Sequence, residues 1–264
     1  MPPPWLLYSP ALRGGSNELL SPILAYEAQL FLLAVLFYLY DSSVLLYSNE
    51  AVLTCDRAQR WTATTGRAGL IFAGRALRVL NPFTPHRPSF RLSWNFHSLE
   101  SSVSDRGWSE RARDLDALAP MTLTAGIALY GLLPLGLFTA LGAYAILPAL
   151  AALYGSTLLA LRQVHRQKLL VAFGRNHFVG FAFECLACPP FAVNMVRRVT
   201  LAKRISEPLP MAAARLLDAA KWVKLRAYCL GRLDEALQLV AEHSDDEKSL
   251  EAQKQRLSTL GQPT

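Results

Sequence analysis

The longest apolar segment of the chain runs from Ala117 to Leu161 and contains no Asp, Glu, Lys, Arg or His. One membrane helix needs about 20 residues, whereas these 45 residues in a single helix would measure roughly 67 Å, about twice the thickness of a bilayer's hydrocarbon core. Pro, Gly and Thr residues between Pro134 and Gly142 interrupt the Leu- and Ala-rich pattern. We therefore predict a transmembrane helical hairpin over residues 117–161 that reverses in this interval.

A second apolar segment, residues 23–47, is rich in Leu, Phe and Tyr and is long enough to cross a bilayer. Residues 1–22 before it lack the basic start of a cleaved signal, so we predict an extracytoplasmic segment followed by a retained first transmembrane helix. Glu27 and Asp41 lie 14 residues apart and near one helical face. We interpret both as residues at the two membrane interfaces, and the alternative is a polar path for a proton or an ion.

Short segments typical of β-strands follow the first apolar segment. Five pieces rich in Val, Thr, Trp, Phe and Leu are separated by turn signals: Ala51–Cys55, Trp61–Thr65, Leu70–Ala73, Leu77–Leu80 and Phe90–Trp94. Gly74 stands where a hairpin turn is needed, and the three prolines of residues 81–88 favour a loop because proline cannot donate to a strand ladder. For residues 48–116 we predict a small antiparallel sheet followed by a polar helix over 98–116.

The part after the hairpin has a basic start, an apolar middle and a charged end. We expect residues 162–209 to stay at the interface or in the cytoplasm, because Pro189 and Pro190 would break a membrane helix; a fourth span over Phe173–Val196 is the alternative. Residues 210–243 predict an amphipathic helix with an apolar stripe at seven-residue spacing, formed by Leu216, Val223, Leu230 and Leu237. This stripe packs either in the protein's own core or against a partner helix or a second copy. Residues 244–264 predict a polar tail with weak helical character.

The positions of Lys and Arg predict the orientation. One of them, Arg13, precedes the first span, ten lie between Tyr47 and Ala117, and sixteen follow Leu161. Positive loops stay in the cytoplasm, so three crossings place the start of the chain and the hairpin turn outside and the C-terminal part inside. The predicted fold class is therefore a membrane α-helical protein of about three transmembrane helices, multi-pass in the cell (inner) membrane, with a cytoplasmic sheet and a helical C-terminal region.

The composition agrees with this assignment. Hydrophobic residues make up 52% of the 264 residues, charged residues only 18%, and the mean hydropathy is +0.21. These values exclude a disordered chain, and four cysteines are too few for a disulfide-dense secreted module. The net charge of +7 suits contact with anionic lipid headgroups. Because the basic residues are spread along the chain rather than gathered in one stripe, we expect no nucleic acid partner.

The one local motif with chemical content is the pair Cys185 and Cys188. Two thiols at this spacing can form a redox disulfide or supply half of a metal site, and His177 and Glu184 lie close in sequence as an acid/base pair. No second CxxC or HxxxH completes four metal ligands, and no glycine-rich phosphate loop is present, so we expect neither a metal nor a cofactor.

Three hypotheses for function follow. The first is a non-catalytic accessory, assembly or scaffold subunit that sits in the lipid bilayer and docks a protein partner or a second copy on its cytoplasmic face. The second is an enzyme at the membrane interface that uses the Cys185 and Cys188 pair for thiol-redox or metal-dependent chemistry. The third is an oligomeric small transporter or channel with Glu27 and Asp41 facing a shared path.

Overall fold

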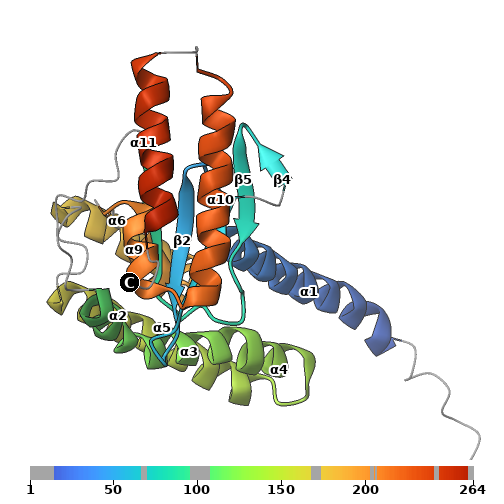
Figure 1. Cartoon of the computed structure of the whole chain (residues 1–264). Coiled ribbons are helices and arrows are strands. Elements are labelled where there is room, and N and C mark those ends of the chain that lie inside the picture. Colours follow the sequence, from blue (N-terminus) through green and yellow to red (C-terminus); the bar gives the residue numbers. More distant parts are fainter. Residues whose placement is uncertain are drawn as a thin grey trace, which may run out of the picture.

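The computed structural model describes residues 15–66, 70–95, 108–167, 174–202, 205, 207–240 and 244–260 (Figure 1). Within these ranges, strands occupy the part of the chain after the first apolar segment, and helices precede and follow them. This order of elements is the one that the apolar pattern predicts.

The apolar segments form long helices. They are α1 (Gly15–Asp41), α3 (Ala119–Ile127), the π-helical turn η2 (Ala128–Leu132), α4 (Leu133–Phe138) and α5 (Ala143–Arg166), with the shorter polar helix α2 (Trp108–Asp116) before α3. The predicted helical reversal is confirmed, and its last residue, Gly142, has a φ of +46°, a conformation that glycine adopts without strain. A Cβ atom at Gly136 would lie 2.7 Å from Ile146 Cγ1, so glycine there lets α4 and α5 approach closely.

Two helical stretches among the described residues are long and apolar enough to cross a membrane, Ala112–Phe138 and Ala143–Arg166. Only 28% and 33% of the most apolar window in each is buried within the protein. An apolar helix in the core of a soluble protein would be mostly buried, so this exposure favours a lipid environment. The first predicted span is also a helix, but its predicted end at Tyr47 is wrong, because the chain leaves α1 at Asp41 and pairs into a sheet.

The strands form two sheets rather than the single sheet predicted. The six strands of the described chain are β1 (Ser43–Leu46), β2 (Glu50–Cys55), β3 (Trp61–Thr65), β4 (Leu70–Phe72), β5 (Arg75–Val79) and β6 (Ser89–Ser93). The first sheet has the order β1-β5-β4 and the second β3-β2-β6, and all pairs are antiparallel. The predicted turn at Gly74 is confirmed: Ala73 and Gly74 have φ of 49° and 75°, as a tight hairpin turn requires.

The C-terminal part is helical throughout its described residues outside short connections. Its helices are α6 (Gly174–Ala187), α7 (Pro189–Val193), α8 (Met195–Ala202), α9 (Leu209–Leu216), α10 (Ala219–Leu237) and α11 (Asp245–Thr259). As expected, the chain breaks before Pro189, which begins α7. The single helix predicted for residues 210–243 is wrong, because Asp218 accepts a hydrogen bond from Lys221 N at 2.9 Å and starts a new helix.

The polar tail predicted for residues 244–264 is also wrong, since most of it forms α11. The Ser244 side chain accepts a hydrogen bond from Glu247 N at 3.1 Å, and acidic residues fill the first turn, where the helix dipole favours them. Leu250 and Leu257 are buried against the main core. The cap at Ser244 and the packing of Leu250 and Leu257 against the core therefore stabilise α11, although the segment contains few apolar residues.

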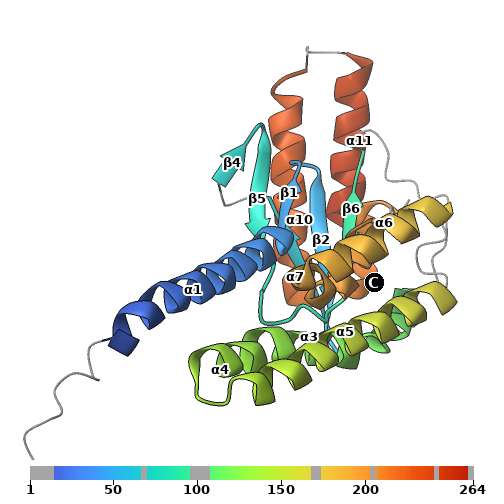
Figure 2. The same ribbon diagram turned by 180° about the vertical axis from the view of Figure 1, so that it is seen from behind.

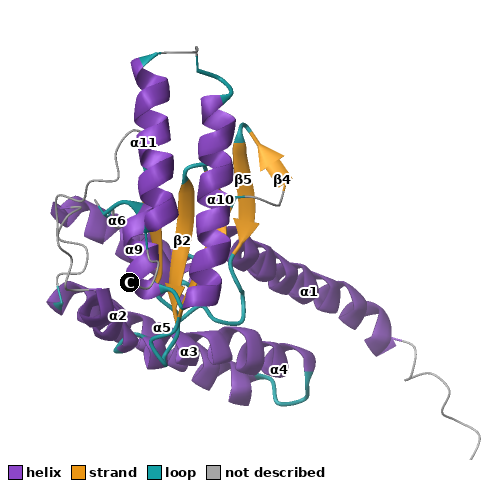
Figure 3. Cartoon of the chain, viewed as in Figure 1, coloured by secondary structure: helices purple, strands orange, loops and turns teal. Residues whose placement is uncertain are grey.

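The main core lies between the second sheet and the C-terminal helices. Its largest members include Phe90, Leu53, Met195 and Leu257, and the rings of Trp61 and Phe90 lie 6.0 Å apart. The α10 and α11 helices stand side by side on one face of the strands, whereas α6 and α7 lie on the opposite side (Figures 1 and 2). Figure 3 shows β2, in orange, between these helical layers, whereas β4 and β5 lie beside α10.

The start of α1 and the turn between α4 and α5 lie on the same side of the molecule (Figures 1 and 2). The end of α1 lies near the middle of the molecule, where it joins the first sheet (Figure 1).

Candidate functional site

The end of α1 meets α7, α8 and the loop after β5 in a polar cluster with a buried centre, which we call the junction: Tyr38, Asp41, Ser42, Asn81, Thr84, Asn194, Arg197 and Arg198. Asn194 lies where α7 ends and α8 begins, and its amide Nδ2 donates to Tyr38 O at 3.3 Å and to Ser42 Oγ at 3.0 Å. The Tyr38 hydroxyl in turn donates to Pro82 O. These bonds tie α1 and Ser42 to segments that are 44 to 156 residues away in sequence.

Arg197 is the largest buried side chain of the junction and is only 1% exposed. Its guanidinium donates to Asn81 O, to Thr84 O at 2.8 Å and to Ser42 Oγ at 3.5 Å. Burial lowers the pKa of Arg197 to about 10, so the group stays charged at neutral pH. Backbone carbonyl dipoles take the place of water around this charge, and they hold the 81–84 loop against α1.

Arg198 connects three helices. Its Nε lies 3.4 Å from Asp41 Oδ1 of α1, its Nη2 pairs with Glu184 of α6, and its guanidinium lies 4.4 Å from the ring centre of Phe191 in α7. A planar guanidinium can engage two carboxylates and an aromatic face at once, which an ammonium group cannot. Asp41, predicted to sit at a membrane interface, is thus also part of a structural ion pair.

The predicted chemical pair lies beside this junction. Cys185 is buried in the main core, Cys188 is half-buried at the break between α6 and α7, and both are free thiols. Burial raises the pKa of the Cys185 thiol to about 12 and also raises the pKa of the Cys188 thiol. Both thiols are therefore protonated near pH 7, whereas a nucleophilic or metal-binding cysteine needs the thiolate.

The structure does not bring the predicted acid and base to these thiols as a site. His177 is exposed near the start of α6, and the Glu184 carboxylate pairs with Arg198. No group of three or more His, Cys, Asp or Glu residues among the described part of the chain has the geometry to hold a metal ion.

An apolar cleft of about 560 Å³ opens between α1, the loop after β5 and the α3–η2 helices. Tyr38 and Tyr130 lie at its base with ring centres 5.2 Å apart, and the Tyr130 hydroxyl donates to Ala34 O at 3.3 Å. The cleft walls are almost entirely apolar. Tyr130 belongs to the π-helical turn η2, and such single turns within α-helices often occur at functional sites.

A second groove runs along α10. Two adjoining cavities of about 330 Å³ and 560 Å³ share Ala227 and Tyr228 as walls and together extend from β3 to the turn of the first sheet. Lys221, Lys224, Arg232 and Glu235 line the groove. Because Arg232 pairs with Glu235, the basic part of the groove is the end beside β3, at Lys221 and Lys224. The Lys221 ammonium donates to Trp61 O at 3.1 Å, and the Tyr228 hydroxyl donates to Ser48 O at 2.8 Å, so α10 is fixed to the strands on both sides of the groove.

The predicted apolar stripe does not form one surface. Leu216 belongs to α9, Leu230 and Leu237 are half-buried against the main core, and Val223 is 53% exposed. The buried face of α10 is instead formed by Trp222, Leu225, Tyr228, Cys229 and Leu233. Residues seven positions apart do not fall on the same line of a straight α-helix, so the stripe turns gradually around α10. In addition, the helix breaks at residue 217, so Leu216 belongs to α9 rather than to α10.

Ser42, Asn194 and Arg197 are not predicted from the sequence. The available signal was weak: Asn194 and Arg197 are polar residues in an otherwise apolar run that follows two prolines. Their partners are backbone carbonyls of distant segments, which no local pattern reveals. Comparison with protein families, with curated proteins and with solved structures finds no match to this chain.

Proposed function

We propose that this chain is a non-enzymatic, membrane-anchored scaffold. In this proposal α1 and the α3–α5 hairpin cross the membrane, and the sheets with α8–α11 form a cytoplasmic module that binds a protein partner. The observation that carries the proposal is the junction: the charged and polar side chains near the thiol pair are engaged in joining α1 to the module, as a fixed anchor needs. An enzyme would need some of them directed into an open cleft.

Three further observations support the membrane anchor. The two apolar helices of the hairpin are mostly exposed, α1 has the length to cross a bilayer, and the start of α1 and the hairpin turn lie on one side of the molecule. The distribution of Lys and Arg then favours the module on the cytoplasmic side.

The groove along α10 is the surface that fits a partner best. It is basic where Lys221 and Lys224 line it, and one wall there is β3, the outer strand of the second sheet. An extended segment can lie beside an outer strand and form backbone hydrogen bonds with it, while the lysines attract acidic side chains. We therefore propose an acidic, extended segment of a partner protein as the occupant.

The test blocks the groove without touching the core. A Cβ atom at Gly231 meets no other atom within 4 Å, and Ala227 is exposed, so Gly231→Trp and Ala227→Trp should fold and fill the groove. Val223→Trp is the matched control, because it adds the same ring to the same helix at an exposed position that does not line the groove.

Each full-length variant is purified in mild detergent from its native cells, and co-purifying proteins are quantified. We expect one partner whose recovery falls at least about tenfold with both groove variants and is unchanged with the control. Equal recovery of every co-purifying protein from all variants would contradict docking in this groove. As a further control, the amount of each variant extracted from the membrane is compared. Equal amounts would show that the substitutions leave the membrane anchor unaffected.

A further inference from the structure

The strand β4 exposes three consecutive large apolar side chains. Leu70, Ile71 and Phe72 are 76%, 79% and 69% exposed. Successive residues of a strand point to opposite faces, so Leu70 and Phe72 project from one face of β4, and Ile71 lies on the other face, where it borders the groove along α10. An apolar outer strand of this kind is a liability in water unless another surface covers it.

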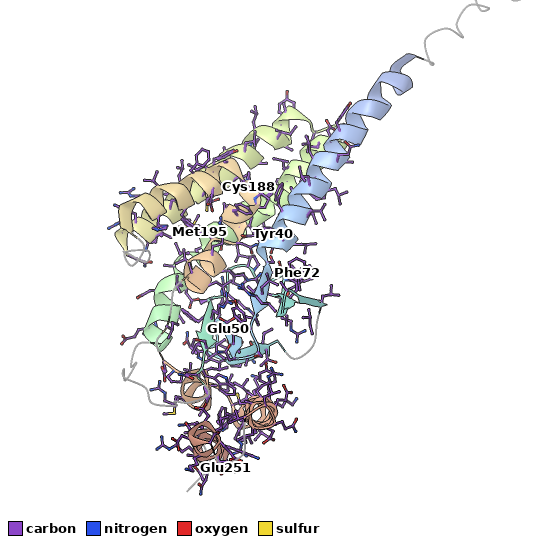
Figure 4. The ribbon with its side chains drawn as sticks, turned by 90° about the horizontal axis from the view of Figure 1, so that it is seen from above. Tyr40, Glu50, Phe72, Cys188, Met195 and Glu251 are labelled. Carbon is purple, nitrogen blue, oxygen red and sulfur yellow. The ribbon has the colours of Figure 1, made fainter. Side chains whose placement is uncertain are left out.

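The position of β4 shows which surface is nearest. β1 begins two residues after the end of α1, β5 pairs with β1, and β4 pairs with β5, so the first sheet is attached directly to the end of α1. The strands β4 and β5 run across the direction of the α3–α5 hairpin (Figure 1). Phe72 and Tyr40 lie at the same end of α1 in Figure 4, and Figures 1 and 2 also place β4 beside that end.

The side chains around this level are those of a membrane interface. Tyr40 and Phe83 are exposed aromatic residues near the end of α1, and Phe83 borders the apolar cleft. Arg75, next to the β4–β5 turn, lies with its guanidinium 4.2 Å from the ring centre of Tyr47 and donates to the Tyr47 hydroxyl. Exposed aromatic rings and arginines are enriched where a protein meets lipid headgroups.

We infer that β4 inserts its apolar side chains into the headgroup–acyl boundary of the membrane that α1 crosses, with Arg75 among the anionic headgroups. This inference rests on the proposed membrane anchor. The first sheet then lies along the bilayer surface, and it fixes the rotation and the height of the module relative to the membrane. The occupant of the apolar edge is a bilayer that contains anionic lipid.

A second copy of the chain fits the edge less well. β4 has three residues, so an added strand would gain few backbone hydrogen bonds. Pairing along the edge would also leave the Leu70 and Phe72 side chains exposed, whereas a lipid phase covers both of them.

The test measures depth with a fluorescent label. Full-length protein carrying Cys188→Ala, which removes the one native thiol that is not buried, is reconstituted in vesicles of phosphatidylcholine and phosphatidylglycerol. Single cysteines are introduced by Ile71→Cys, by Leu158→Cys on the exposed face of α5 and by Val223→Cys on α10, and each is labelled with an environment-sensitive dye. Quenching is measured with doxyl-labelled lipids and with aqueous iodide.

We expect the label at residue 71 to be quenched by shallow doxyl lipid at least about threefold more than the label at residue 223, and to be protected from iodide. Iodide access at residue 71 without doxyl quenching, while residue 158 is quenched by lipid, would overturn this inference and leave the anchor standing. Failure of lipid quenching at residue 158 would instead overturn the membrane anchor. If protection from iodide at residue 71 rises with the protein density in the vesicles, and the labels of two copies lie close together, the edge binds a second copy. That result would also overturn the inference.

Discussion

Replacing Arg197 by Met is expected to loosen the junction between α1 and the module. The side chain is 1% exposed, and its guanidinium donates to Asn81 O and to Thr84 O. Methionine supplies a similar apolar stem but no donor. Both carbonyl groups then lose the charged donor that satisfied them.

The magnitude follows from two opposing effects. A hydrogen bond to a charged group contributes about 1.5–3 kcal/mol to the free energy of unfolding, and two such bonds are lost. Removing the buried charge recovers part of its desolvation penalty, so the expected net loss is about 2–4 kcal/mol. Since 1 kcal/mol corresponds to a Tm change of roughly 2–4 °C for a chain of this size, the Tm should fall by roughly 4–16 °C.

The assay is thermal unfolding of the full-length protein in mild detergent, followed by tryptophan fluorescence. Arg60→Met is the control, because the Arg60 side chain is 75% exposed and pairs with Asp56 at the surface, where an ion pair contributes at most about 1 kcal/mol. Arg197→Lys keeps the charge but loses the planar fork, so it should fall between the two. A Tm decrease for Arg197→Met no larger than that for Arg60→Met would refute the reasoning, because the carbonyl contacts would then contribute nothing.

Three further predictions follow from the same structure. Cys185 and Cys188 should react slowly with a thiol reagent near pH 7 and rapidly after denaturation, because burial raises both thiol pKa values; fast modification of the native protein would contradict this. Ser244→Ala should reduce the stability of α11 by about 1 kcal/mol, measured by amide hydrogen exchange of that helix, whereas Ser244→Asp should preserve it. Burial, and then the nearby Arg57, lower the pKa of His86, so the unfolded chain binds the proton first and stability should fall as the pH drops below about 6.5; His86→Gln should weaken this dependence, and an unchanged pH profile would argue against it.

The elements that could be predicted from the sequence are those whose signals are local. Trp61–Thr65 was predicted with the same bounds as β3, and Gly74 was predicted as a turn, because strand composition and turn chemistry act over a few residues. The helical reversal before Gly142 was also found, since an uncharged segment too long for one span needs a break.

The errors arise where distant contacts override the local pattern. Residues 43–46 continue the apolar run of α1, and only their pairing with β5 makes them a strand. The helix α11 has few apolar residues, and the packing of Leu250 and Leu257 on the core stabilises it. Such tertiary effects are invisible in a window of the sequence.

The candidate site was predictable only in part. The segment around Cys185 was recognised as the place where chemistry could lie, and the structure places it next to the junction. The junction itself depends on backbone carbonyls at Asn81 and Thr84, more than 110 residues from Arg197, and on the exact end of α1. Neither feature follows from side-chain patterns, because a carbonyl acceptor is present at every residue.

The central claim is that α1 and the α3–α5 hairpin cross a membrane and leave the module inside the cell, and labelling of single cysteines in intact cells tests it most directly. In the Cys188→Ala background, Thr139→Cys lies in the hairpin turn and Gln255→Cys lies on the exposed face of α11. We predict that a membrane-impermeant maleimide labels residue 139 in intact cells and labels residue 255 only after the membrane is permeabilised. Labelling of residue 255 in intact cells, or of neither residue until permeabilisation, would contradict the claim.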